Sequence, residues 1–324
     1  MDIYIKQTVL HQFTPDDTEL VLSDQLLAIS PKIEEYLRKK IQRVYSDDAK
    51  TGILGEDHPF LQKAKSDLLE ASLSIAQLWK EEFVLSENQK TNDLLFVAYE
   101  KNGMEHFAFL RIALRENLVH IGENPEKPLM LTHNNLPSAG SAPDEALLIN
   151  LQSGKYHLIE KRIKHNGAFL NYFSDNLLQD KPTISAKKSI QAVEKTAQKI
   201  ADNFQQGDFQ FQSKVKSAIF NHLEEDGELS PEKLANQLFD QNLTARLSFV
   251  DELKELVPEK IVFEEIDASR QLKKFENQKL SLSNGIELIV PNNIYQDAES
   301  VEFIQNEDGT YSILIKNIED IKNQ

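Results

Sequence analysis

Three cations along one predicted helix, Lys32, Lys39 and Arg43, have the type and spacing that suit contact with phosphate groups. The helix is predicted to begin after Ser30-Pro31, because serine caps a helix N-terminus and proline is preset for the first turn. At about 100° per residue, the three cations fall on one line that faces outward. A separate apolar face can meet a core and comprises Ile33, Leu37, Ile41 and Val44.

Two further basic groups occur later in the chain. They are Lys161, Arg162 and Lys164, beside His165, and Arg270, Lys273 and Lys274. Each group also has a simpler interpretation as a solvated face that covers apolar edges. Phe169 and Tyr172 follow the second group and could stack on bases. Their spacing at i and i+3 instead favours the core face of a helix, and we expect both in the core.

The chain lacks the motifs of common catalytic and nucleotide-binding sites. No G-x-G-x-x-G, G-x-x-x-x-G-K-S/T, G-x-S-x-G or H-E-x-x-H occurs, and the eight histidines show no metal-ligand spacing. Around Gly227 the sequence is similar to a calcium loop, but His222 and Lys233 stand at the two end positions where carboxylates are required. We therefore expect no cofactor and interpret this segment as a helix–loop–helix connection.

The overall charge argues against a protein that coats DNA along its whole surface. The 324 residues include 36 Lys+Arg and 52 Asp+Glu, for a formal charge of −16. A chain this acidic is repelled as a whole by nucleic acid and by anionic membranes. Screening at physiological salt acts over about 8 Å, so a phosphate responds mainly to the nearest patch. A local basic site on an acidic body is therefore compatible with this charge.

What the sequence lacks also predicts a cellular compartment. The chain has no cysteine, which excludes disulfides, zinc-thiolate sites, iron–sulfur clusters and cysteine nucleophiles and fits a reducing cytoplasm. The start, Met1-Asp2-Ile3, lacks the basic and apolar regions of a signal peptide. No apolar run approaches the roughly 18 residues that span a bilayer. We expect a soluble cytoplasmic protein with no membrane partner.

An antiparallel sheet with helices is predicted for residues 1–165. Asn102-Gly103 favours a tight hairpin turn, because both positions tolerate positive φ. A helix that ends near residue 47 and a longer one over 60–86 should pack on the sheet, and 133–144 reads as a surface loop. The predicted strands are 3–13, 19–22, 94–99, 106–114, 118–121, 129–131, 147–149 and 156–163.

Helical patterns follow, and β-hairpins return near the end. Helices are predicted over 185–204 and 211–223, after Ser230-Pro231, and over 243–256. Two hairpins should turn at Asn284-Gly285 and at Asp308-Gly309. The predicted fold class is α+β, with an N-terminal antiparallel sheet, a central helical region and C-terminal β-hairpins. The predicted domains are 1–165, 166–257 and 258–324.

Several segments, taken in order, resemble a known family. They are residues 9–12 (VLHQ), 19–24 (ELVLSD), 43–46 (RVYS) with Lys50 and 52–54 (GIL), the basic strand 158–162 with the aromatic helix 169–173, and 269–275 (SRQLKKF) with 285–286. Together they resemble the bacterial nucleoid-associated proteins of about this mass, 37.0 kDa. The resemblance implies a non-enzymatic cytoplasmic protein that associates with the nucleoid, and it supplies no catalytic residues.

The main hypothesis is weak DNA binding without sequence specificity through the three basic groups. RNA is an alternative ligand, and DNA-processing proteins and a second copy of the chain are further candidate partners. One alternative function is an adaptor whose acidic runs, such as 224–226 and 251–252, bind basic surfaces of DNA-processing proteins, so that nucleoid association is indirect. A second alternative is a metal-dependent nuclease whose sequence-distant carboxylates converge in the fold.

Overall fold

The computed structural model describes the chain except residues 1, 16–17, 46–48, 88–89, 121–128, 205–208, 255, 258–260, 263–264 and 321–324. It describes only the backbone of residues 119–120, 129–130, 209, 262, 265–268 and 270. Two compact units make up the chain, Met1–Ser185 and Ala186–Gln324. Each unit is described below by itself.

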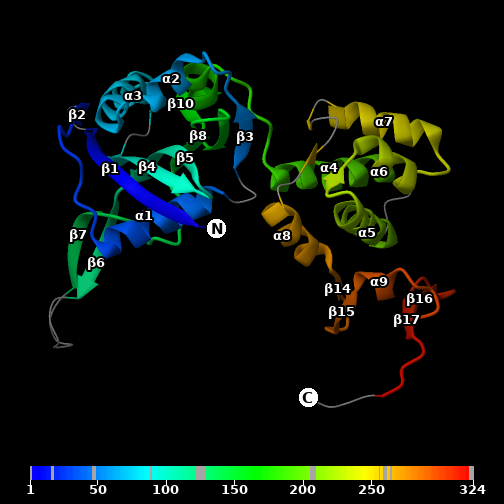
Figure 1. The fold of residues 1–324 in the computed structure, drawn as a ribbon. Coiled ribbons are helices and arrows are strands. Elements are labelled where there is room, and N and C mark those ends of the chain that lie inside the picture. Colours follow the sequence, from blue (N-terminus) through cyan, green and yellow to red (C-terminus); the bar gives the residue numbers. More distant parts are fainter. Residues whose placement is uncertain are drawn as a thin grey trace. The chain divides into compact units, whose positions relative to one another are not determined.

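The first unit is built on a seven-stranded antiparallel sheet (Figure 1) with strand order β2-β1-β4-β5-β8-β9-β3. Asn102 and Gly103 at the β4–β5 turn have φ values of 52° and 77°, as the Asn-Gly dipeptide predicted. The turn fixes the register that pairs Lys101 with Met104. The strands are β1 (Ile3–Thr14), β2 (Glu19–Val21), β3 (Lys50–Ile53), β4 (Asn92–Lys101), β5 (Met104–Ala113), β8 (Glu145–Asn150) and β9 (Lys155–Ile159).

Helices cover both faces of this sheet. One face carries α1 (Pro31–Val44), whose apolar side packs in one cluster with alternate residues of the strands. The other face carries α2 (Pro59–Lys65), α3 (Leu68–Phe83) and the π-helix η1 (Phe173–Leu178) around Trp79 and Phe109. Because both faces are covered, β4 and β5 are buried at consecutive positions, as in sheets enclosed by helices.

The single helix predicted over residues 60–86 is wrong, because the structure has two helices there. α2 ends at Lys65, and α3 starts at Leu68. The Asp67 carboxylate accepts a hydrogen bond of 2.9 Å from the Leu69 N–H and so caps α3. Aspartate favours the N-cap position over the helix interior, because its carboxylate accepts hydrogen bonds from nearby backbone N–H groups. This preference explains why one continuous apolar pattern is divided into two helices.

Two short ribbons extend the first unit. β6 (Arg115–His120) pairs with β7 (Leu129–Asn135), and β10 (Ile163–His165) pairs with β11 (Ala168–Leu170). The first ribbon confirms the strands predicted near residues 118–121 and 129–131, although residue 121 lies outside the described residues. The loop predicted over 133–144 starts too early, because β7 continues to Asn135. Strand β9 ends at Ile159, so Lys161 and Arg162 lie in the connection to β10 rather than in the basic strand that the family resemblance implied.

The second unit begins with helices and ends with hairpins, as predicted. Ser230 caps α6 by accepting a hydrogen bond of 3.4 Å from the Lys233 N–H, and residues 226–230 connect α5 to α6 as expected. The helices are α4 (Ala186–Asn203), α5 (Phe209–Glu225), α6 (Pro231–Leu238), α7 (Leu243–Lys254), α8 (Glu265–Phe275) and α9 (Asn292–Tyr295). The strands are β12 (Glu228–Leu229), β13 (Ile261–Val262), β14 (Asn277–Ser281), β15 (Glu287–Pro291), β16 (Val301–Gln305) and β17 (Tyr311–Ile315).

The fold class is confirmed as α+β, with an antiparallel sheet first, helices in the middle and hairpins at the end. The boundary between the two compact units, at Ser185, differs from the domain boundaries predicted at residues 165 and 257. Tyr172, Phe173 and Leu178 belong to the apolar cluster of the first sheet, so the segment just beyond residue 165 packs on the first unit. The three-domain division stays a prediction about independently folding parts.

Candidate nucleic-acid interface

Helix α1 presents its basic line to solvent because its opposite side is anchored in the core. Ser30 caps the helix by accepting a hydrogen bond of 3.4 Å from the Ile33 N–H, and Pro31 occupies the first turn. Leu37, Ile41 and Val44 are at most 1% exposed and fix the rotation of the helix on the sheet. Lys32, Lys39 and Arg43 are exposed in consequence.

The three cations of this line differ in how much of their charge is available. Lys39 forms an ion pair of 2.6 Å with Glu35, one turn earlier, and this pair lowers the pKa of the Glu35 carboxyl. Within the described parts of the chain, Lys32 and Arg43 form no ion pair. The sequence pattern located the line correctly, but it gave equal weight to a lysine that already has a carboxylate partner.

Sequence reasoning missed Arg38, a fourth exposed cation of α1. At about 100° per residue it falls well away from the line of Lys32 and Arg43, which is why the pattern did not include it. Arg38 and Gln42 border a shallow cavity of about 360 Å³. Its other lining residues are Asp2, Ile3, Tyr4, Glu100, Asn102 and Gly103. The two acids in this lining reduce its attraction for a phosphate.

Lys40 lies on the same helix but has a structural role. Its ammonium donates hydrogen bonds of 2.9 Å to the Ser138 carbonyl, the Ser141 carbonyl and the Ser141 hydroxyl. The side chain is fully buried, and burial lowers its pKa to about 8. Lys40 therefore holds the loop of residues 136–144 against α1 and is not available to a phosphate.

Two lysines of the second predicted group are engaged with carboxylates. Lys161 pairs with Asp144 at 2.5 Å, and Lys164 pairs with Glu87 at 3.0 Å. Burial alone would raise the pKa of Asp144, but the Lys161 ammonium and the Ala113 N–H outweigh it and lower that pKa. The hydrogen bond from Lys164 likewise lowers the pKa of Glu87. Arg162 is exposed and, among described residues, forms no ion pair.

The third predicted group lies on α8 in the second unit. Lys273 and Lys274 are exposed in the last turn of the helix, where cations interact favourably with the helix dipole. The Lys274 ammonium lies 4.9 Å from the centre of the Phe275 ring. The side chain of Arg270 lies outside what the structure describes. These lysines thus have a structural explanation that does not require a ligand.

The two aromatic residues after the second group differ in burial. Tyr172 is fully buried, as predicted, and donates a hydrogen bond to Glu145. Phe169 is 64% exposed on β11, so its assignment to the core is wrong. The implied aromatic helix over 169–173 is wrong as well, because β11 ends at Leu170 and η1 starts at Phe173. The i, i+3 spacing was misleading because no helix links the two residues.

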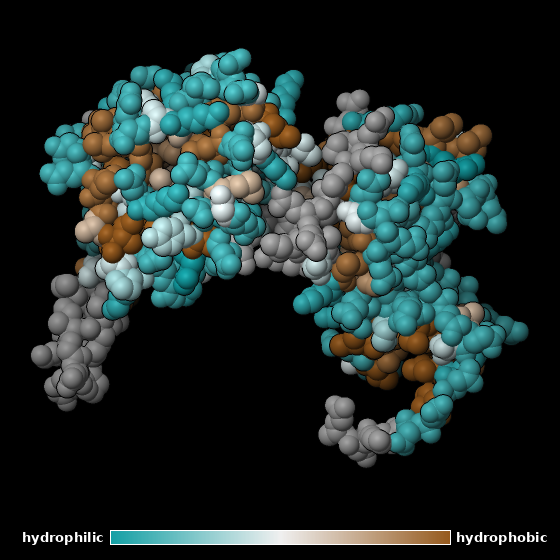
Figure 2. Space-filling view, in the orientation of Figure 1, coloured by the Kyte–Doolittle hydropathy of each residue, from teal (hydrophilic) through white to brown (hydrophobic). Residues whose placement is uncertain are grey.

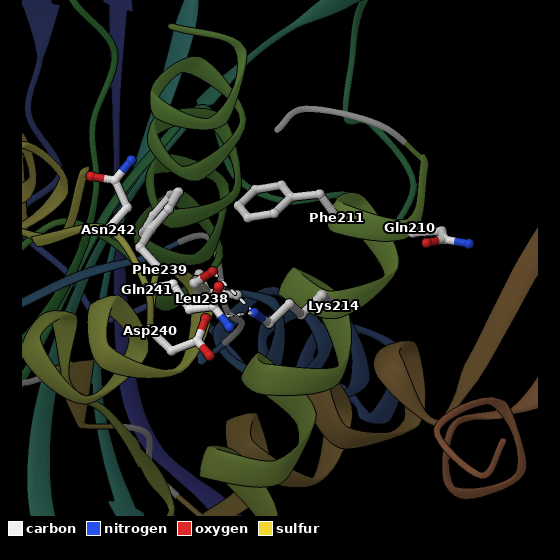
Figure 3. A pocket seen from close by; sticks show the side chains of 8 residues that line it. All are labelled: Gln210, Phe211, Lys214, Leu238, Phe239, Asp240, Gln241 and Asn242. Carbon is white, nitrogen blue, oxygen red and sulfur yellow. Dashed lines mark hydrogen bonds and ion pairs between the residues drawn. The ribbon is translucent and has the colours of Figure 1, made fainter. Parts of the chain in front are cut away.

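A cavity of about 260 Å³ lies in the second unit, between the start of α5 and the turn from α6 to α7 (Figure 3). The Phe211 and Phe239 rings lie 5.4 Å apart beside it. The Lys214 ammonium donates to the Leu238 carbonyl at 3.1 Å and lies 3.7 Å from Asp240. Because the cation of this lining already has two partners, the cavity offers no free charge to an anion.

The described residues contain no group of three or more His, Cys, Asp or Glu side chains that could hold a metal ion. The nuclease hypothesis therefore gains no supporting residues from that part of the chain. The same described residues contain no helix that is both long and apolar enough to cross a membrane.

Comparison with known proteins gives a match to a family model that spans nearly the whole chain. The family model NA37, described as nucleoid-associated protein YejK, matches residues 7–322. No curated protein matches the chain. The match confirms the resemblance that the ordered segments indicated. The chain belongs to the NA37 family of nucleoid-associated proteins.

Proposed function

We propose that this chain is a non-enzymatic protein that binds DNA weakly and without sequence preference, through the exposed cations of α1. The observation that carries the proposal is the pair Lys32 and Arg43, exposed on a helix whose other side is fixed in a core. Nucleoid association follows from the family, and a fixed line of cations is the feature of the fold that suits a run of phosphates.

Contacts between cations and phosphates depend on the charge of the nucleic-acid backbone and not on the base sequence. Ammonium and guanidinium groups that meet phosphates release counterions, and they carry no information about the bases. At physiological salt, charges further than about 8 Å from a phosphate are largely screened. A phosphate near α1 is therefore attracted by the cations of this helix and is little affected by the more distant acidic residues. Because backbone phosphates occur in both nucleic acids, RNA should compete with DNA for the same cations.

The other predicted cations contribute less in this proposal. Lys161 and Lys164 would have to leave Asp144 and Glu87 before they could meet a phosphate. Arg162 is exposed and could add one contact within the first unit. Lys273, Lys274 and Arg270 lie in the second unit, and their contribution is proposed only as an addition to that of α1.

The test is binding of the pure protein to a labelled random-sequence duplex over a range of salt concentrations. Two phosphate contacts predict a slope of log affinity against log salt near about −1.8, and a third contact from Lys39 would bring it to about −2.7. The double variant Lys32→Gln, Arg43→Gln should lose most of this slope. No binding of the wild type even at low salt would refute the proposal and favour the adaptor.

A matched control separates the α1 line from net charge. Lys63 and Lys65 are exposed on α2, which covers the opposite face of the same sheet. The double variant Lys63→Gln, Lys65→Gln changes the charge by the same amount and should keep the wild-type slope. An equal loss in both double variants would mean that the binding depends on overall charge and not on α1.

The same samples test the absence of enzymatic activity. The duplex should stay intact after incubation with magnesium or manganese. Cleavage that requires the added metal and stops with EDTA would instead support the nuclease alternative.

A further inference from the structure

The C-terminal hairpins of the second unit expose an unusual amount of apolar surface. Figure 2 shows brown, hydrophobic patches over the region of β14 to β17. Large apolar side chains between 39% and 63% exposed are Ile286, Ile289, Ile294, Ile304, Tyr311, Leu314, Ile315 and Ile318. Scattered exposed apolar residues are ordinary, but a concentration of this kind marks an interaction surface.

Strand β17 is the most exposed of these strands. Four of its five residues are exposed, whereas β16 has Val301 buried and Phe303 packed 5.3 Å from the ring of Tyr295 in α9. The sheet contains just β16 and β17 in the described part of the chain. A sheet of two strands is marginally stable in water, and one more strand would extend it.

The register of the hairpin shows which backbone groups of β17 face outward. The Asn306 N–H donates to Thr310 at 2.8 Å, and the Lys316 N–H donates to Ser300 at 2.9 Å. Hydrogen-bonded and non-bonded pairs alternate in an antiparallel ladder. Ile313 and Ile315, which pair with Phe303 and Val301, are therefore at non-bonded positions. Their N–H and C=O groups point to the outer edge of β17, where the described residues place no further strand.

The charge around this edge indicates the chemistry of its partner. Residues 296–320 contain seven acidic side chains, Asp297, Glu299, Glu302, Glu307, Asp308, Glu319 and Asp320, and one basic side chain, Lys316. Lys316 is already paired with Glu302 at 2.6 Å. A second copy of the chain would bring the same acids to the interface, and like charges at an interface are strongly unfavourable.

We propose that the outer edge of β17 binds an extended protein segment in which apolar residues alternate with lysine or arginine. The segment adds as a third strand, with main-chain hydrogen bonds to Ile313 and Ile315. Its apolar side chains cover the face of the hairpin that carries Tyr311, Ile313 and Ile315, and its cations meet the acidic rim. This surface belongs to the second unit, whereas the α1 line for which we propose DNA binding belongs to the first.

The test uses the full chain and a labelled ten-residue peptide of alternating valine and lysine. Binding is followed by fluorescence anisotropy. The same peptide with glutamate in place of lysine should not bind, because the rim is acidic. A peptide with N-methylated backbone at alternate residues keeps its side chains but cannot pair with a strand edge. It should bind about tenfold more weakly, the effect of losing one to two hydrogen bonds.

Two proline variants test which edge accepts the peptide. Ile315→Pro removes an N–H from the outer edge of β17, and Gln305→Pro removes one from the outer edge of β16. Both residues are exposed, and proline is tolerated where the N–H faces away from the partner strand. Ile315→Pro should weaken peptide binding about tenfold, and Gln305→Pro should leave it unchanged, with unfolding temperatures checked for both.

Three results would overturn the proposal. Equal affinity for the N-methylated peptide would show that strand addition does not occur. Loss of binding in Gln305→Pro alone would assign the partner to β16. Sedimentation of the pure protein as a dimer that Ile315→Pro dissociates would show that a second copy occupies this edge instead.

Discussion

At the scale of single residues, the most consequential interaction is a buried ion pair in the first core. Arg111 Nε donates to Glu145 at 2.7 Å, and the side chains are 7% and 0% exposed. Tyr172 also donates to the same carboxylate, and Arg111 Nη1 donates to Asn92 at 2.9 Å. Removal of one charge would leave the other buried without its partner, so Glu145→Gln should lower the free energy of unfolding by about 3 kcal/mol.

Urea denaturation measures this change, and an exposed pair in the same sheet provides the control. Lys6 and Glu105 lie 3.0 Å apart, but their side chains are 35% and 71% exposed. Glu105→Gln should therefore leave the free energy of unfolding nearly unchanged, because exposed pairs are screened by solvent. Similar losses in the two variants would mean that burial does not determine how much the Arg111–Glu145 pair contributes to the free energy of unfolding.

His11 gives the first unit a sensitivity to acid. It is 1% exposed, its Nδ1 accepts from the Ser23 N–H at 3.0 Å, and its Nε2 lies 3.0 Å from the Ser72 hydroxyl. Burial lowers its pKa from the ordinary 6.5 to about 4. In this interval the unfolded chain binds the proton and the folded chain does not, so stability falls as the pH drops from 6.5 towards 4.

The comparison of wild type with His11→Gln isolates this contribution. Between pH 6.5 and 5 the wild type should lose about 1.6 kcal/mol more of its unfolding free energy than the variant, because the unfolded histidine is already half protonated at pH 6.5. Urea denaturation at the two pH values gives both numbers. The same pH dependence in the two proteins would show that His11 does not titrate in this interval.

At the scale of elements, two glycines separate backbone strain from steric overlap. Gly154 and Gly103 have φ values of +69° and +77°, in the region that side chains rarely adopt. A Cβ on Gly154 would overlap the Leu54 carbonyl oxygen, whereas a Cβ on Gly103 would have nothing within 4 Å. Gly103→Ala should destabilise the protein by about 1 kcal/mol and Gly154→Ala by several kcal/mol more, as measured by urea denaturation. Equal losses would mean that Leu54 moves aside without cost.

The elements also show what sequence patterns can predict. The long strands β1, β4 and β5 and the Asn-Gly turn were predicted correctly, because strand patterning and turn chemistry are local properties. The short strands β3 and β11 were not predicted, because their pairing depends on distant parts of the chain or on a turn that the pattern does not show. The break at Ser66–Asp67 was missed, because the apolar pattern continues across a capping residue. Phe169 was misplaced because its surroundings depend on the hairpin β10–β11, which the spacing of two aromatic residues does not reveal.

At the scale of the whole molecule, the sequence predicted where cations occur but not which of them are free. The chain has 52 acidic side chains for 36 Lys+Arg, and the fold determines which lysines lie beside a carboxylate. Glu35, Asp144 and Glu87 neutralise Lys39, Lys161 and Lys164 respectively. The last two acids are distant in sequence from their lysines, so the pairs follow from tertiary structure alone.

The division into two units leads to a prediction for separate fragments. Among the described residues, the two apolar clusters that enclose the first sheet extend to Leu178 and include none beyond Ser185. Residues 1–185 should therefore fold alone and unfold in one cooperative step, as measured by circular dichroism in urea.

Because α1 lies in this fragment, the DNA affinity of the fragment should show the same salt slope as that of the full chain. A folded fragment without DNA affinity would contradict the assignment to α1. A slope steeper by about one in the full chain would assign one further phosphate contact to the second unit.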